Sequence, residues 1–76
     1  MNQFEKITHD VNIMGGKACI SGTRVTVGMI IGQLSEGKTA EMLVGEYPYL
    51  SIDDIFEALK YAAWVLNAEE MSIKTA

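Results

Sequence analysis

Apolar residues recur at helical spacing through the middle of the chain and predict a first helix over residues 27–36. The apolar positions lie at i, i+3, i+4 and i+7, which is typical of a helix with one face on a core. They are Val27, Ile30, Ile31 and Leu34. Thr26 is a good N-cap. Gly37 follows the last turn, where a left-handed residue commonly ends a helix, and Lys38 suits the negative end.

A second, shorter helix is predicted over residues 40–46. Thr39 caps its start, and Met42 and Leu43 are expected to point inward, with Tyr47 as a further candidate. Pro48 ends this helix because the residue before a proline is pushed out of the helical region.

The third helix is the longest, running from Ile52 to about Asn67, and Ser51 with Asp54 resembles a capping box at its start. Its expected inward stripe consists of Ile52, Ile55, Phe56, Leu59, Ala62, Ala63 and Leu66. A second, weaker stripe consists of Ala58, Tyr61, Val65 and Ala68, with Trp64 beside it. A helix that is apolar on nearly two faces is either central or shared across an interface, and sharing is favoured in so thin a domain. We therefore expect Ala58, Tyr61, Trp64 and Val65 to form a dimer or partner interface.

Before the first helix, residues 4–25 alternate over short distances and predict a small β element with a glycine-rich loop. Residues 4–9 form a candidate strand, and Gly15-Gly16 and Ser21-Gly22 are turns, since glycine adopts positive φ without steric cost. The fold class expected is mostly α: a three-helix, helix-turn-helix-like bundle with a small N-terminal β-hairpin or ribbon. Residues 1–76 form one domain, with helices in 26–67 and a frayed tail over 68–76.

Composition narrows the possible classes of protein. Nearly half of the residues, 49%, are apolar, which is high for 76 residues and suggests that some apolar surface is covered by a second copy or a partner. No stretch is long enough to cross a membrane, and a single cysteine is typical of a reducing cytoplasm. The net charge of −4 divides into +1 for residues 1–38 and −5 for residues 39–76. Contacts with an anionic polymer are therefore expected on the N-terminal half.

Enzymatic readings of the glycine-rich stretch find little support. Gly15-Gly16-Lys17 lacks the spacing and the following Ser or Thr of a phosphate-binding loop. Cys19 and His9 could act as nucleophile and base, but no orienting third group is present at a recognisable spacing. One cysteine and one histidine cannot form a zinc site within a monomer. We expect no catalytic residue, no metal site and no cofactor.

The glycine-rich stretch is nevertheless specific, and with its surroundings it resembles a known family of small bacterial proteins. The matching residues are His9-Asp10, Ile13, Gly15-Gly16-Lys17, Cys19-Ile20, Gly22-Thr23-Arg24-Val25, Val27, Leu34, Gly37, Tyr47-Pro48, Leu50, Asp54-Ile55, Ala58-Leu59 and Tyr61-Ala62-Ala63. The family is catalogued as the domain of unknown function four-three-three. The resemblance implies a helix-turn-helix-like domain that dimerises. It also implies an antitoxin paired with a PIN-like ribonuclease toxin, or a transcriptional regulator.

The chain departs from the family pattern at four positions. Val11, Ala18 and Thr26 stand where proline is common, and Ser21 stands where arginine is common. The missing arginine lowers the positive charge of the loop, which weakens the nucleic-acid reading.

The candidate contact residues are Lys17, Ser21, Thr23 and Arg24. Arg24, the one arginine, could contact a phosphate or a partner's carboxylate, or could instead tie the loop together. The acidic first turn of the third helix, with Asp53 and Glu57, makes major-groove reading by that helix unfavourable. We expect a non-enzymatic, cytoplasmic, antitoxin-like homodimer that binds a nuclease toxin and can bind DNA. The alternative is a stand-alone helix-turn-helix transcriptional regulator.

Overall fold

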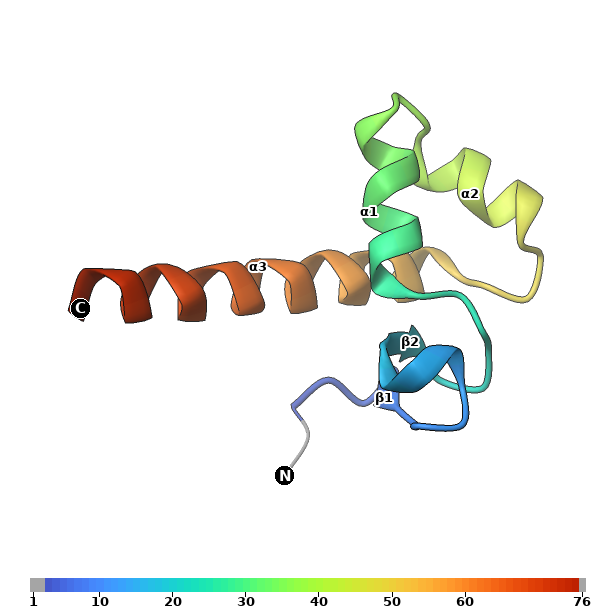
Figure 1. The fold of residues 1–76 in the computed structure, drawn as a ribbon. Coiled ribbons are helices and arrows are strands. Elements are labelled where there is room, and N and C mark those ends of the chain that lie inside the picture. The colour runs from blue at the N-terminus through green and yellow to red at the C-terminus, as the bar shows by residue number, and fades with distance from the viewer. Residues whose placement is uncertain (1–2, 76) are drawn as a thin grey trace.

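The computed structural model describes the backbone of residues 3–75 and the side chains as far as Glu69. Its elements are β1 (Ile7–His9), a short 3₁₀ turn η1 (Met14–Gly16), β2 (Ala18–Ile20), α1 (Val27–Ser35), α2 (Ala40–Glu46) and α3 (Ile52–Thr75). In Figure 1, α1, α2 and the two strands gather around the first part of α3, while the rest of α3 projects away as a single helix. We call residues 3–62 the body and residues 63–75 the arm. The mostly α fold with a small N-terminal hairpin confirms the predicted fold class.

The hairpin is an antiparallel pair in which Ile7 lies opposite Ile20 and His9 lies opposite Ala18. The strand predicted over residues 4–9 is shorter in the structure, because the Ile7 amide donates to the carbonyl of Phe4 in a turn. Gly15 and Gly22 have φ angles of 67° and 78°, so both predicted turns use the left-handed conformation that glycine adopts easily. Thr26 bridges back to Cys19 and joins the start of α1 to this ribbon.

Both short helices begin at the predicted caps. The Thr26 hydroxyl accepts from the Met29 amide at 2.9 Å, and the Thr39 hydroxyl accepts from the Met42 amide at 3.1 Å. Gly37, with a φ angle of 103°, follows α1 as expected. The inward placement of Met42 is wrong, since its side chain is 52% exposed. Its sulfur instead lies 3.4 Å from the Thr39 amide, at the exposed start of α2.

The start of α3 has the predicted capping box. The Asp54 amide donates to the Ser51 hydroxyl at 3.2 Å, and the Asp54 carboxylate accepts from the Ser51 amide at 2.9 Å. The predicted end near Asn67 is wrong, because α3 remains helical to Thr75. Residues 68–75 contain neither glycine nor proline, so nothing in the sequence stops the helix there. The last residue of the expected frayed tail, residue 76, lies outside the described residues.

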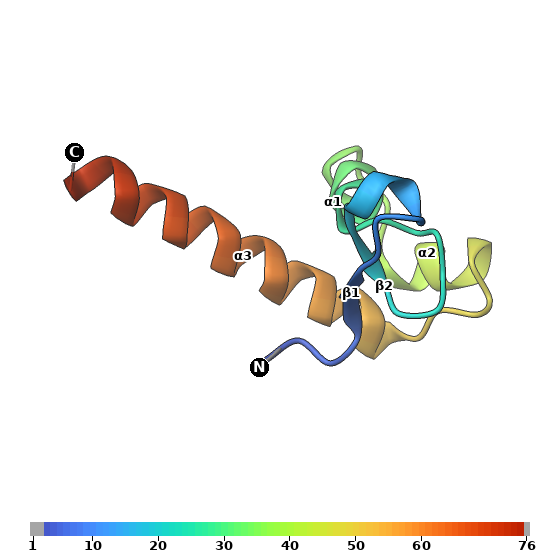
Figure 2. The same cartoon turned by 60° about the horizontal axis from the view of Figure 1, so that its bottom comes forward.

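The core lies where the hairpin and α1 meet the first half of α3, with α2 closing one end (Figure 2). Its buried apolar residues are Ile7, Ile20, Val25, Val27, Ile30, Leu43, Leu50, Ile55 and Ala58. The inward stripe predicted for α3 is only partly right. Ile55 is fully buried, but Phe56 and Leu66 are 51% and 59% exposed. The body packs instead on the side that carries Ala58, whose small side chain lets neighbouring elements approach closely.

Candidate interaction surfaces

The structure brings three of the four predicted contact residues together. Ser21, Thr23 and Arg24 line a shallow surface pocket of about 490 Å³ that Tyr49 completes from the loop before α3. Lys17 does not belong to this pocket. It lies on the rim of a separate apolar groove between α1 and α3.

Within the shallow pocket, the Thr23 hydroxyl is used to build the turn. It donates to the Ile20 carbonyl at 2.8 Å and accepts from the Val25 amide at 3.0 Å. Its single proton is therefore already committed. Thr23 shapes the loop that presents Arg24.

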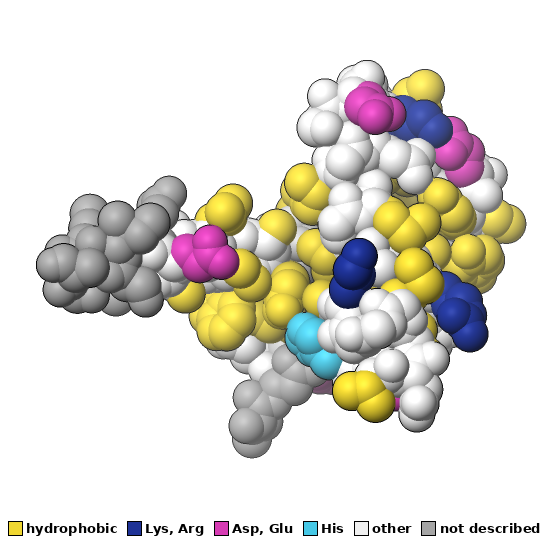
Figure 3. Space-filling view, viewed as in Figure 1, with side chains coloured by type: hydrophobic (Ala, Val, Ile, Leu, Met, Phe, Trp, Pro, Cys, Tyr) yellow, Lys and Arg dark blue, Asp and Glu magenta, His cyan; other side chains and the backbone are white. Residues whose placement is uncertain are grey.

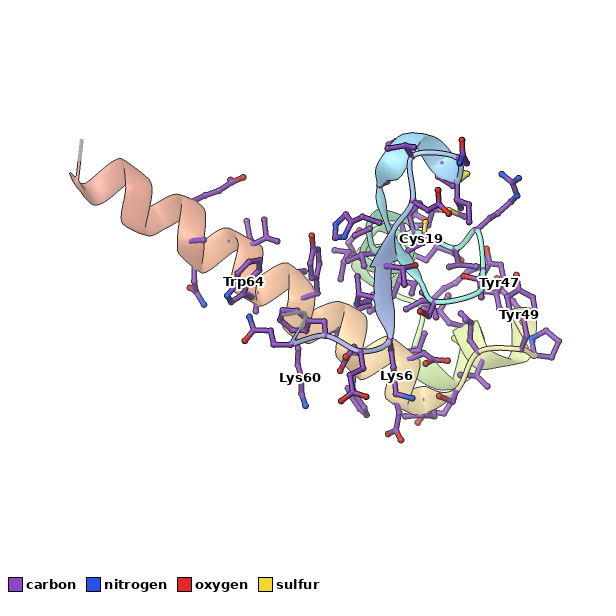
Figure 4. All side chains as sticks on the ribbon, turned by 90° about the horizontal axis from the view of Figure 1, so that it is seen from below. Lys6, Cys19, Tyr47, Tyr49, Lys60 and Trp64 are labelled. Carbon is purple, nitrogen blue, oxygen red and sulfur yellow. The ribbon has the colours of Figure 1, made fainter. Side chains whose placement is uncertain are left out.

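The sequence left open whether Arg24 contacts a partner or ties the loop together. In the structure its side chain is exposed. Among the residues that the structure describes, none forms a hydrogen bond or an ion pair with it. Tyr49 beside it is 63% exposed and packs edge-on against Tyr47, with the ring centroids 6.1 Å apart. Figure 4 shows the two tyrosines side by side near the end of α2. The pocket thus offers one free guanidinium and one exposed phenol.

The second surface is an apolar groove of about 890 Å³ between the N-terminal half of α1 and the middle of α3. Val27 and Ile31 contribute from α1, and Tyr61, Val65 and Leu66 contribute from α3. Figure 3 shows apolar side chains gathered in the corner where the arm leaves the body. The groove is open along its length, so a helix or an extended segment could lie in it.

The four residues predicted to form an interface are separated by the structure. Ala58 has no exposed surface and belongs to the core, so its assignment to an interface is wrong. Tyr61 and Val65 are half-buried in the wall of the groove, whereas Trp64 is 51% exposed on the arm. Sequence reasoning missed Leu66 in the groove because the periodic pattern placed it in the inward stripe.

Tyr61 ties the N-terminal segment to α3. Its hydroxyl lies 3.0 Å from Nε2 of His9, and its ring packs edge-on against Phe4. Trp64 also contacts Phe4, with ring centroids 5.8 Å apart, and Figure 4 shows it beside the N-terminal segment. His9 thus has a structural partner in Tyr61, while Cys19 is only 2% exposed. This arrangement gives no indication of a nucleophile and base pair.

Part of the acidic start of α3 is engaged within the chain. Lys6 lies 3.7 Å from the Asp54 carboxylate, and its amide donates to Glu57 at 3.3 Å. Asp54 thus both caps the helix and pairs with Lys6, and Glu57 holds the N-terminal segment. Among the described residues, no cluster of histidine, cysteine and carboxylate side chains could hold a metal ion. In the same part of the chain, no helix is long and apolar enough to span a membrane.

The comparisons with known proteins agree on one family. A family model described as a protein of unknown function, DUF433, matches residues 7–62, which is nearly the whole body and none of the arm. The fold is also similar to the crystal structure of a DUF433 member protein from Anabaena variabilis, solved at 2.00 Å, with a TM-score of 0.74 and 26% identity. That alignment covers 91% of this chain and 66% of the other, so this chain spans just under two thirds of its length. No curated protein matches the sequence. Because the family model covers most of the chain, the protein belongs to the DUF433 family, whose function is unknown.

Proposed function

We propose that this chain is a non-enzymatic interaction module, an antitoxin-like homodimer that binds and blocks a partner nuclease of the PIN-like ribonuclease class. The observation that carries the proposal is the apolar surface that remains outside a complete core. Leu66 is more than half exposed and lines the groove, and Trp64 is more than half exposed on the arm outside the groove lining. Contiguous apolar surface of this kind marks protein contacts.

The chemistry of the partner follows from Arg24. A planar guanidinium with two parallel donors is suited to a carboxylate, and this one has no partner among the described side chains. Nucleases that use metal ions hold them with clustered carboxylates. An arginine presented on a rigid turn beside Tyr49 could occupy such a cluster and displace the metal that the nuclease needs.

Binding of DNA by the same basic loop is the second candidate function. The exposed Arg24 and Lys17 favour it, since both lie on the half of the chain with net positive charge. Phosphate contacts would make the affinity fall steeply with salt. One arginine and one lysine, on two separate surface features, point to a weak contribution unless two copies act together.

The decisive experiment first looks for a PIN-like nuclease gene next to the gene of this chain, whose absence would contradict the proposal, and then pairs the two purified proteins. We expect the wild-type chain to suppress cleavage of a single-stranded RNA, and Arg24→Ala to raise the concentration needed for half inhibition by about tenfold, which corresponds to the loss of one charge-assisted contact. Lys60→Ala is the matched control. It also removes one exposed cation, but from α3 outside the pocket.

Two outcomes would contradict the proposal. One is a chain with no effect on the nuclease at saturating concentration. The other is equal inhibition by the Arg24 and Lys60 variants. Binding to the host's own promoter DNA that weakens steeply with salt, and that is lost in Lys17→Ala/Arg24→Ala, would favour the regulator instead.

A further inference from the structure

Two glycines of α1 line the groove between α1 and α3. Gly28 and Gly32 lie one turn apart on α1, and both line it. A Cβ added at Gly32 would meet no atom within 4 Å, and one added at Gly28 would meet only the Thr26 hydroxyl at 3.8 Å. The fold of the single chain therefore does not require glycine at either position.

Glycine inside a helix is costly, by about 1 kcal/mol relative to alanine at each position. What glycine offers in return is close approach of another backbone. Two such positions on successive turns, in the floor of an apolar groove, fit a second helix that crosses α1 at short distance.

Most of the arm projects from the body without a packed neighbour among the described residues, although Trp64 near its start contacts Phe4. A helix of 24 residues is about 36 Å long, and only its first part packs on the body (Figure 1). The chain exposes 5253 Å² of surface, whereas a compact monomer of 8.3 kDa exposes about 4,600 Å². The difference of roughly 700 Å² reflects the elongated shape of the chain, which measures 43 × 30 × 20 Å along its principal axes.

A second copy of this chain would cover both the groove and the arm in a single interface. The arm forms one wall of the groove, so a two-fold axis near the groove would lay the arm of each copy against α1 of the other. The charges favour this pairing. Glu69 is exposed on the arm, whereas the rim of the groove carries the exposed Lys17.

We propose that the groove is the docking site for the arm of a second copy, with Gly28 and Gly32 at the point of closest approach. This inference rests on the homodimer of the proposed function and specifies how it is assembled.

The first test uses two apolar side chains of α3 that are exposed to a similar degree. Leu66 is 59% exposed and lines the groove, whereas Phe56 is 51% exposed and does not. In sedimentation equilibrium we expect Leu66→Glu to raise the dimer dissociation constant by more than about a hundredfold, with little change for Phe56→Glu. The reverse order would place the dimer contact on the other side of α3 and overturn the proposal.

The second test asks whether the dimer requires close approach of two helix backbones or only contact between apolar side chains. Gly28→Ala/Gly32→Ala should make the isolated monomer more stable, because alanine is the better helix former. It should nevertheless weaken the dimer by about tenfold or more, which corresponds to over 1.4 kcal/mol. Gly45→Ala, in α2, is the control, because its added Cβ also meets nothing within 4 Å. It should leave the dissociation constant unchanged.

The outcomes distinguish this inference from the function on which it rests. A wild-type chain that sediments as a monomer throughout the micromolar range, yet inhibits the nuclease, contradicts the docking of the arm and the homodimer, and leaves only the inhibition of the nuclease standing. A dimer that responds to these variants as expected, yet does not inhibit the nuclease, supports the docking and contradicts the function. A double-alanine variant that dimerises as well as the wild type removes the role given to the two glycines and overturns the proposal.

Discussion

The two halves of α3 have similar composition and opposite surroundings. In the first half, Ile55 and Ala58 have no exposed surface and lie under α1 and the hairpin. In the arm, Trp64 and Leu66 are more than half exposed. The difference shows that the body completes its core without the arm. Exposed apolar side chains occur on both parts of the chain, and those of the arm, Trp64 and Leu66, are the ones that the proposed second chain would cover.

The largest expected effect concerns the buried first half of α3. Ile55→Ala removes a side chain that is completely buried, and we expect the free energy of unfolding to fall by about 2–5 kcal/mol. In so small a domain this loss approaches the total stability. Urea denaturation followed by circular dichroism, at concentrations where the chain is monomeric, measures it. A loss below 1 kcal/mol would mean that the core is not centred on α3.

The next effect compares two helix caps that make the same bond in different surroundings. The Thr26 hydroxyl caps α1 and its residue is only 6% exposed, whereas Thr39 caps α2 at the surface. We expect Thr26→Ala to cost about 1–2 kcal/mol and Thr39→Ala about 0.5–1 kcal/mol. The same denaturation experiment measures both. Equal losses would show that burial does not strengthen the cap at Thr26.

These caps belong to the features that the sequence predicted well. Thr26, Thr39 and Ser51 each act within one turn of the chain, so short-range chemistry alone places the start of α1, α2 and α3. Gly37 is a similar case, because its positive φ depends only on the end of α1. Local rules are sufficient wherever the partner lies three or four residues away.

The errors lie where the partner is distant in the sequence. Phe56 and Ala58 both continue an apolar period, and only the packing of α1 and β1 decides which of them is covered. A bulky residue looks like the better core residue in the sequence, but the alanine allowed the closer approach. The same limit applied to the candidate site. Lys17 and Arg24 are neighbours in the glycine-rich stretch, yet they line different surface features.

A smaller effect is expected for an exposed apolar side chain of the arm. Leu66→Ala shortens a side chain that is 59% exposed, so we expect the stability of the monomer to change by less than about 0.5 kcal/mol. This is the counterpart of Ile55→Ala on the same helix. If Leu66→Ala costs more than 1 kcal/mol in the monomer, the arm packs on its own body in solution, and its apolar surface is not available to a second chain.

The smallest effect is expected at Arg24, where the sequence left both a structural tie and a partner contact open and leaned toward the tie. The side chain is exposed, and no described residue bonds to it, so Arg24→Ala should leave the free energy of unfolding within about 0.5 kcal/mol of wild type. Thr23→Ala should cost more, because its hydroxyl holds the turn with two hydrogen bonds. Thermal and urea denaturation of both variants measure this order. If Arg24→Ala destabilises the chain more than Thr23→Ala does, the guanidinium holds the loop together, and its proposed contact with a partner's carboxylate loses its basis.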